Sequence, residues 1–185
     1  MTGPIETEIK IPFPVGAAEA LRLIQERGYP LVSPRTLESD QVFDLPDQSL
    51  RRAGQLLRLR SAGGQSILTY KGPVLPSRHK SREEIETSFS SSAALEQILE
   101  RLGYTPSFRY QKYRTAFRTV GESGTVFLDE TPIGVFLELE GPADWIDRTA
   151  IHLGFAESDY VTRSYASLYA SHLEHHLGPR DMLFA

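Results

Sequence analysis

The chain has 185 residues, of which 40% are hydrophobic and 24% are charged, as in an ordinary soluble globular protein. The formal net charge of −4 argues against a general nucleic-acid binder, and the absence of cysteine excludes disulfides, thiolate metal sites and cysteine nucleophiles. No apolar run approaches the roughly 18 residues of a membrane span, and no secretory signal is visible, so we expect a cytoplasmic protein with neither a membrane nor a nucleic acid as partner.

Strand-like and helical patterns follow one another along the chain. Residues 4–12 alternate with the period of a strand, and apolar residues from Ala17 to Ile24 then recur at helical spacing. Ser90 to Ser92 offer N-caps for a second helix, a third begins near Pro142, and a fourth runs from Tyr165. Further strand patterns lie at residues 40–45, 55–61, 66–71, 81–89, 108–119, 125–130 and 134–140.

Turn residues join several of these strands directly. "SAGGQ" (61–65) and "TPIG" (131–134) each read as the turn of a β-hairpin. Many antiparallel strands with few helices predict an α+β fold with a closed or strongly curved sheet. The stretch 72–81, "GPVLPSRHKS", has two prolines, and we expect it to be an exposed, mobile connection.

Most strand patterns carry charged residues of the same sign two positions apart, which places them on one face. The first strand has Glu6, Glu8 and Lys10 on one parity, and "LLRLR" has Arg58 and Arg60. One interpretation is that these faces form the solvated outside of the sheet. The other is that they point inward, where the acids would meet the bases and would need partners.

Inward-pointing faces would suit two kinds of ligand. Hard divalent cations such as Mg²⁺ prefer oxygen ligands and often bind carboxylates together with substrate phosphates. Lysine and arginine suit phosphate, arginine by bidentate contact. The acids on these faces are Glu6, Glu8, Glu84, Glu86, Asp129, Glu138 and Glu140, and the bases are Lys10, Arg58, Arg60, Lys71, Arg82, Lys112 and Arg114.

The spacing of these residues resembles the CYTH superfamily, the triphosphate tunnel metalloenzymes, which includes class IV (CyaB-type) adenylyl cyclases and triphosphatases. The Glu6-x-Glu8-x-Lys10 spacing matches the ExExK signature of that superfamily. The later signatures follow in the same order over roughly residues 4–170: "VFDLPD" (42–47), "LLRLR" (56–60), "TYKGP" (69–73), "SREEIE" (81–86), "KYR" (112–114), "LDETPIGVFLELEGP" (128–142) and "SYASLY" (164–169).

The resemblance implies one tunnel domain spanning residues 1–185, with its core at about 4–170. Its fold would be an eight-stranded antiparallel β-barrel, a tunnel with helices packed outside. One or two Mg²⁺ or Mn²⁺ ions would bind to Glu6, Glu8, Asp129, Glu138 and Glu140. A triphosphate would bind to Lys10, Arg58, Arg60, Lys71, Arg82, Lys112 and Arg114, with Lys10 also catalytic and Glu84 and Glu86 in support.

The activity implied first is that of a class IV adenylyl cyclase, which converts ATP to cyclic AMP and pyrophosphate. The alternatives are an inorganic or thiamine triphosphatase, or a non-catalytic module that binds polyphosphate. Val42 stands where some triphosphatases of the superfamily have a tyrosine, which weakens the thiamine triphosphatase interpretation. The expected partner is ATP or another triphosphate, and a homodimer is an open possibility.

Three further groups have simpler interpretations. His172, His175 and His176 share one helix face, and we expect a solvated helix end rather than a zinc site. We expect the aromatic rings of Trp145, Tyr165 and Tyr169 to pack in the core rather than stack on a base. Arg78 and Lys80 share the parity of Arg82 and could close over a substrate.

Overall fold

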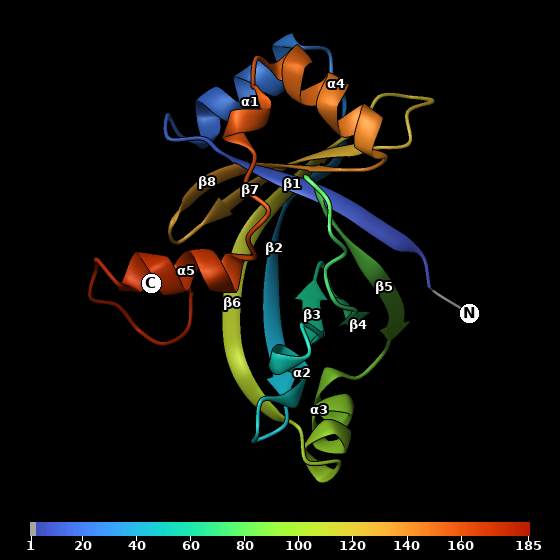
Figure 1. Cartoon of the computed structure of the whole chain (residues 1–185), viewed down its shortest axis with the longest axis vertical. Helices are drawn as coiled ribbons and strands as arrows, with labels where there is room; N and C mark the ends of the chain where they lie inside the picture. Colours follow the sequence, from blue (N-terminus) through green and yellow to red (C-terminus); the bar gives the residue numbers. More distant parts are fainter. Residues whose placement is uncertain (1–2) are drawn as a thin grey trace.

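In the computed structural model, which describes residues 3–185, the strands form one closed antiparallel barrel (Figure 1). Around the barrel the strands follow the order β1-β5-β4-β3-β2-β6-β7-β8, and β8 pairs with β1 to close the ring. The α+β barrel expected from the sequence is therefore confirmed. The strands are β1 (Ile5–Pro12), β2 (Leu31–Asp44), β3 (Leu56–Ala62), β4 (Gln65–Lys71), β5 (Lys80–Phe89), β6 (Thr105–Phe117), β7 (Thr125–Thr131) and β8 (Gly134–Glu140).

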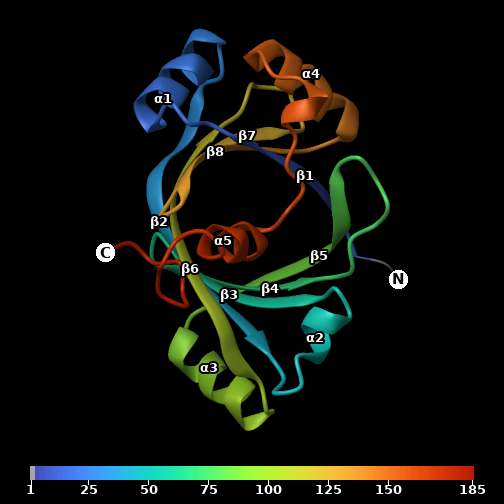
Figure 2. The same cartoon turned by 60° about the vertical axis from the view of Figure 1, so that its left-hand side comes forward.

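The helices lie outside the barrel wall or at its opening. In Figure 1, α1 and α4 form a layer over β1, β7 and β8, whereas α3 lies at the far end of the molecule. Figure 2 shows α5 in front of the barrel opening. No helix within residues 3–185 is both long and apolar enough to cross a membrane. The helices are α1 (Ala17–Glu26), α2 (Ser49–Arg52), α3 (Ser92–Arg101), α4 (Ala143–Leu153) and α5 (Tyr165–Leu173), with a 3₁₀ turn at Glu157–Asp159.

The outer faces of β1 and β8 are apolar because their residues alternate strictly. Ile9 and Leu139 are direct cross-strand partners, and both are fully buried under α1 and α4. Ile24 of α1 and Ile146 of α4 complete this layer. Each such side chain contributes about 1.5–3 kcal/mol when it leaves water. This packing fixes which face of β1 points into the barrel.

A second apolar cluster covers the opposite side of the barrel. Leu99 of α3 packs against Phe43 of β2 and Leu59 of β3, and all three are buried. Ser91 caps this helix by accepting a hydrogen bond from the Ala94 N–H. The two clusters together hold the outward faces of strands from both halves of the chain.

Two features of the first half differ from the sequence expectation. β2 begins at Leu31 rather than at residue 40, because register shifts against β6 accommodate the irregular stretch around Pro34. The short helix α2 follows a tight turn in which the Asp44 carboxylate accepts hydrogen bonds from the N–H groups of Leu45, Leu50 and Arg51. The aspartate of the "VFDLPD" motif, Asp44, therefore has a structural role, because its carboxylate fixes the backbone of the turn before α2.

The connection between β4 and β5 is also more ordered than its composition suggests. The Leu75 N–H donates to the Ser81 carbonyl at 2.8 Å, which extends the β4–β5 pairing. His79 within it is only 2% exposed. The prediction of an exposed connection over residues 72–81 holds for residues 73–78 and is wrong at Gly72, His79 and Lys80, which are buried. The His79 ring packs beside Tyr160.

Candidate active site

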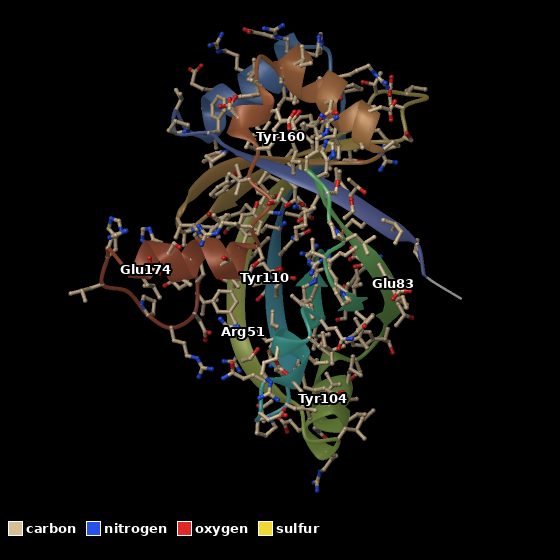
Figure 3. The ribbon with its side chains drawn as sticks, viewed as in Figure 1. Arg51, Glu83, Tyr104, Tyr110, Tyr160 and Glu174 are labelled. Carbon is tan, nitrogen blue, oxygen red and sulfur yellow. The ribbon has the colours of Figure 1, made fainter. Side chains whose placement is uncertain are left out.

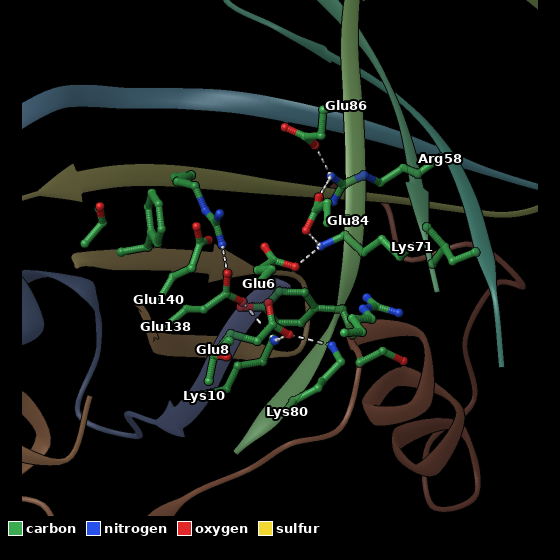
Figure 4. A pocket seen from close by; sticks show the side chains of 18 of the residues that line it. Glu6, Glu8, Lys10, Arg58, Lys71, Lys80, Glu84, Glu86, Glu138 and Glu140 are labelled. Carbon is green, nitrogen blue, oxygen red and sulfur yellow. Dashed lines mark hydrogen bonds and ion pairs between the residues drawn. The ribbon is translucent and has the colours of Figure 1, made fainter. Parts of the chain in front are cut away.

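The inward faces of the strands enclose a cavity of about 1060 Å³. Figure 4 shows acids and bases from several strands pointing toward one another across it. The prediction that the charged faces point inward is confirmed for the members that line the cavity. These are Glu6, Glu8, Lys10, Arg58, Arg60, Lys71, Arg82, Glu84, Glu86, Lys112, Arg114, Glu138 and Glu140.

Two inward acids were missed by the sequence analysis. Glu38 and Asp40 lie on β2, and both are buried on the charged face. They form the same like-sign pair at i and i+2 that marks the other strands. The signal was present in the sequence, but a strand beginning at residue 40 excludes Glu38.

The arginines of β3 are held by these β2 acids. The Arg60 guanidinium donates to Asp40 at 2.8 Å and contacts Glu38 at 3.0 Å. Arg58 lies 3.5 Å from Asp40 and also donates to Glu86 at 3.3 Å. Burial raises the pKa of Asp40, but the nearby guanidinium groups outweigh it and keep the pKa below its ordinary value. This wall of the cavity is therefore a fully charged network.

Asp129 organises a second basic group at the end of β6. Its carboxylate accepts hydrogen bonds from Lys112 at 2.8 Å and from Arg114 at 2.7 Å. It is 0% exposed and accepts a third bond, at 2.7 Å, from the Tyr165 hydroxyl. Asp129 thus lies behind Lys112 and Arg114 rather than on the cavity surface.

Tyr165 joins the first turn of α5 to the charged interior. Its ring lies 5.1 Å from the Lys10 ammonium and 5.2 Å from that of Lys112. The expectation that it packs in the core is confirmed, since it is 6% exposed and contacts Tyr110 and Phe136. The structure adds that Tyr165 also lines the cavity, so the start of α5 closes one end of it. The helical spacing of apolar residues in the sequence predicted that Tyr165 packs in the core, but it could not show that Tyr165 also lines the cavity.

Lys10 is the centre of the acid-rich side. Its ammonium lies 2.8 Å from Glu8 and 2.9 Å from Glu138. Burial lowers the pKa of Lys10, but the two carboxylates outweigh it and raise the pKa above the ordinary value. Lys10 is therefore protonated across the physiological range and acts as a fixed positive charge. Lys71 similarly bridges Glu6 at 2.6 Å and Glu84 at 2.7 Å.

Glu140 has no ion-pair partner among residues 3–185. It faces Glu8 directly across the β1–β8 ladder, where like charges repel. Burial, followed by the charges of Glu6 and Glu138, raises the pKa of Glu140 to about 7. The pKa of Glu84 is likewise raised, to about 8, by burial and by Glu6. Buried carboxylates therefore crowd one another around Glu140.

A divalent cation fits this crowding of carboxylate oxygens. The donor set is all oxygen, as Mg²⁺ and Mn²⁺ prefer, and Glu140 is free to bind. Within residues 3–185 no three acidic or histidine side chains converge as a formed metal site. The reason is visible in the ion pairs, because Glu6, Glu8 and Glu138 are turned toward lysine or arginine. A cation would replace these contacts.

Arg82 is the opposite case, a buried cation that forms no ion pair with any acid of residues 3–185. It is 8% exposed and lines the cavity, and its Nε has no hydrogen-bond partner. Its cross-strand neighbour Glu6 is bound to Lys71 instead. Lys80 lies on the same face, paired with Glu8. Burial, with the charges of Lys10 and Arg82, lowers the pKa of Lys80 to about 8.

Other candidates fall outside the cavity. Arg78 does not reach it, because its guanidinium pairs with Asp147 and Glu157 on the outer surface. Trp145 packs in the core as expected. The rings of His172 and His176 stack on one another at an exposed helix end, and no metal-binding group is present among the residues described.

Comparisons with known proteins agree with this architecture. A protein of Methanocaldococcus jannaschii that is provisionally named an adenylate cyclase is 28% identical over 136 residues, which are 74% of this chain and 76% of that protein. A Vibrio parahaemolyticus structure with the same provisional name has a TM-score of 0.79 at 22% identity, covering 91% of this chain and 99% of that one. A Hippeastrum structure, provisionally an adenylyl cyclase but described as having a dominant triphosphatase activity, has a TM-score of 0.64 at 16% identity, covering 93% and 99%.

The family comparison covers most of the chain. The family described as CYTH domain matches residues 4–165, which include every strand of the barrel and the start of α5. Charged residues from the ExExK, LLRLR, TYKGP, SREEIE and KYR signatures line the cavity, as do Glu138 and Glu140 of the signature at residues 128–142. This chain therefore belongs to the CYTH domain family.

Proposed function

We propose that this protein is a metal-dependent enzyme that acts on a triphosphate, and that it converts ATP to cyclic AMP and pyrophosphate. The observation that carries the proposal is the charge pattern of one cavity. In the part of the chain that the structure describes, Glu140 has no basic ion-pair partner and Arg82 has no acidic one, and both line the same cavity. A cation and a polyphosphate together would neutralise both.

The acidic side would hold the cation. We assign Glu6, Glu8, Glu138 and Glu140 as its ligands because all four supply only oxygen. Glu8, Glu138 and Glu140 adjoin one another on the β1–β8 ladder, and Glu6 precedes Glu8 by two residues on the same face of β1. Asp129 remains a predicted ligand, and its contacts with Lys112 and Arg114 also give it a role in orienting these bases. A bound divalent cation would polarise the phosphate and stabilise charge on its oxygens.

The basic side would hold the triphosphate. Arg82 is the first contact to consider, since its buried Nε has no hydrogen-bond partner and no carboxylate of residues 3–185 forms an ion pair with its guanidinium. Arg58, Arg60, Lys71, Lys112 and Arg114 would exchange part of their acid contacts for phosphate oxygens, and Lys80 joins them from β5. Lys10, held protonated by Glu8 and Glu138, would stabilise negative charge as it develops.

Cyclisation is favoured by the size of the cavity. Its volume of about 1060 Å³ is at the upper end of the range for drug-sized ligands, larger than a bare triphosphate requires. The aromatic side chains of Tyr110 and Phe127 form part of its wall and could contact a nucleoside. In the reaction, the ribose 3′-oxygen would bond to the α-phosphorus while the bond to the bridging oxygen of pyrophosphate breaks. The provisional names of the Methanocaldococcus and Vibrio relatives also support this choice.

Triphosphate hydrolysis is the second candidate. The Hippeastrum protein with the same fold is described as having a dominant triphosphatase activity. The same acids and bases would serve either reaction, with water attacking the γ-phosphorus instead of the 3′-oxygen attacking the α-phosphorus.

The test is to incubate the protein with Mg²⁺ or Mn²⁺ and either ATP or tripolyphosphate. Cyclic AMP with pyrophosphate is the expected result, whereas phosphate release from both substrates would replace the proposal with the triphosphatase. Glu138→Ala should abolish the metal-dependent turnover while the protein stays folded, because Lys10 keeps Glu8 and Arg114 keeps Asp129 as partners. Exposed Glu174→Ala is the matched control and should keep full activity. Unchanged turnover in Glu138→Ala would contradict the metal assignment.

A further inference from the structure

A cluster of polar side chains outside the barrel has no part in the proposed chemistry. At its centre Asp147 of α4 accepts a hydrogen bond from His79 Nε2 at 2.9 Å and one from the Tyr160 hydroxyl at 3.1 Å. Arg78 also donates to Asp147 and reaches Glu157. Figure 3 shows Tyr160 between the helical layer and the barrel.

Asp147 joins two connections that are distant in sequence. His79 belongs to the β4–β5 connection, 68 residues before Asp147, and Tyr160 belongs to the α4–α5 connection, 13 residues after it. His79 is 2% exposed, so its ring is committed to this contact. Burial raises the pKa of Asp147, but the bonds from His79 and Tyr160 outweigh it and lower the pKa, which keeps the acceptor charged.

Each of these two outer contacts lies a short way along the chain from the cavity wall. His79 immediately precedes Lys80, the first residue of β5, and Lys80 points into the cavity, where it meets Glu8. Tyr160 precedes Val161, whose backbone exchanges hydrogen bonds of 2.9 and 2.8 Å with Lys10. The same connection leads on to Ser164 and Tyr165 at the cavity wall.

The cluster is poorly suited to a purely stabilising role. Arg78 and Glu157 are more than half exposed, and exposed ion pairs contribute little to stability. A buried histidine that bonds one carboxylate on a neighbouring element instead restricts where its own segment can lie. Here the segment that His79 restricts leads directly into β5, which begins at Lys80. Lys80 is the first residue of the "KSREEIE" run (80–86), whose alternate residues line the cavity.

We propose that Asp147 is a positioning residue for the triphosphate site, acting through His79 on Lys80 and through Tyr160 on the start of α5. It touches no substrate. Its role is to hold Lys80 at the cavity wall beside Lys10 and Arg82, so that the anion meets three ordered cations. The inference rests on the proposed function only in taking the ligand to be a triphosphate.

The first test is a double-mutant cycle with tripolyphosphate as the probe and calorimetric affinity as the measurement. Asp147→Asn should weaken binding by about three- to tenfold, in the range that coupled residues show. In a Lys80→Met background the same substitution should have a much smaller effect, because the residue it positions has gone. His79→Phe, which keeps a ring beside Tyr160 but removes the donor, should reproduce the loss. An equal loss in both backgrounds would reduce Asp147 to a general structural role and overturn the proposal.

The matched control is Asp144→Asn on the same helix. Asp144 is an exposed carboxylate that bonds only Arg148, one turn along α4. Its loss should leave tripolyphosphate affinity unchanged.

The second test requires no substrate and judges the inference even if the protein binds no triphosphate. Amide hydrogen exchange of the full chain should speed up in Asp147→Asn at residues 75–82 and 160–166, and nowhere else. In Asp144→Asn neither segment should change. Exchange that is unaltered at residues 75–82 would refute the connection between Asp147 and Lys80. Absence of tripolyphosphate binding by the wild-type protein would instead count against the proposed function alone.

Discussion

The basic residues of this cavity differ in whether their removal would leave a buried acid without a partner. Arg60 is bound to Asp40 and Glu38, and the Asp40 side chain is 0% exposed. Removing Arg60 would therefore leave buried acids short of a partner, a change that costs about 3–5 kcal/mol in comparable pairs. Arg82 forms no ion pair within the described residues, so its removal would leave no paired carboxylate of theirs behind. Of these two arginines, Arg82 is thus the one whose effect on ligand binding can be measured without disturbing the fold.

Arg82→Gln should keep the melting temperature of the wild-type protein but lose most of the stabilisation by tripolyphosphate. A charge-assisted contact contributes about 1.5–3 kcal/mol, which corresponds to about a tenfold to hundredfold loss of affinity. Thermal melts across a tripolyphosphate titration measure both quantities, with exposed Arg101→Gln as the control. If tripolyphosphate raised the melting temperature of Arg82→Gln as much as that of the wild-type protein, the anion would bind elsewhere.

At the scale of elements, the β1–β8 ladder concentrates acids. Antiparallel register sets Glu8 opposite Glu140 and Lys10 opposite Glu138, so the ladder itself brings three carboxylates to one lysine. Lys80 and Arg114 from other strands pair with Glu8 and Glu138, which leaves Glu140 as the unbalanced acid. The pKa of Glu140, raised to about 7, reports this imbalance. An acid whose pKa is higher in the folded state binds protons there more tightly than in the unfolded chain, so its contribution to stability is lost as the pH rises through that window.

The protein without a divalent cation should therefore lose stability between about pH 5 and pH 8, by no more than about 3 kcal/mol from Glu140. Glu140→Gln should flatten this decline in part, since Glu84 contributes in the same direction. Urea unfolding at the two pH values measures the difference, and Glu174→Gln is the exposed control. An equal loss of unfolding free energy in the wild-type and Glu140→Gln proteins would show that the β1–β8 register does not force repulsion between carboxylates.

The sequence predicted these elements unevenly. Strict alternation in β1 and β8 predicted the strands and placed their acids on one face, but it left open which side of the sheet that face occupies. The inward direction was implied by the resemblance to the CYTH superfamily. β2 was shortened because Pro34 and the register shifts near it break the alternation that identifies a strand. Asp147 was missed because nothing local distinguishes an acid on a helix whose partner lies 68 residues away.

For the whole molecule, the cavity couples two ligands of opposite charge. A cation alone would neutralise the charge of Glu140 but would place further positive charge near Lys10. An anion alone would neutralise the charge of Arg82 but would place further negative charge near Glu138. Because each ligand neutralises what the other would leave unbalanced, they should bind cooperatively.

Mn²⁺ and tripolyphosphate together should raise the melting temperature by more than the sum of their separate effects. The measurement is a set of four melts at constant ionic strength: neither ligand, each alone, and both. Glu140→Gln is the informative variant, since it should reduce the cooperative part more than the effect of tripolyphosphate alone. A tripolyphosphate shift that does not depend on Mn²⁺ would contradict a shared site.

The pairing of β1 with β8 also has a consequence for how the chain folds. Ile9 and Leu139 face each other in the finished ladder, so the barrel cannot close until nearly its whole sequence has been synthesised. Contacts between such distant residues make folding slow. Until closure, both strands have unpaired edges, and an exposed edge is a template for aggregation. On the open sheet, however, the charged faces are still in water, and stacking them against another chain would require these charges to be removed from water, which is costly. The side chains assigned here to ligand binding would thus also keep the nascent chain from aggregating.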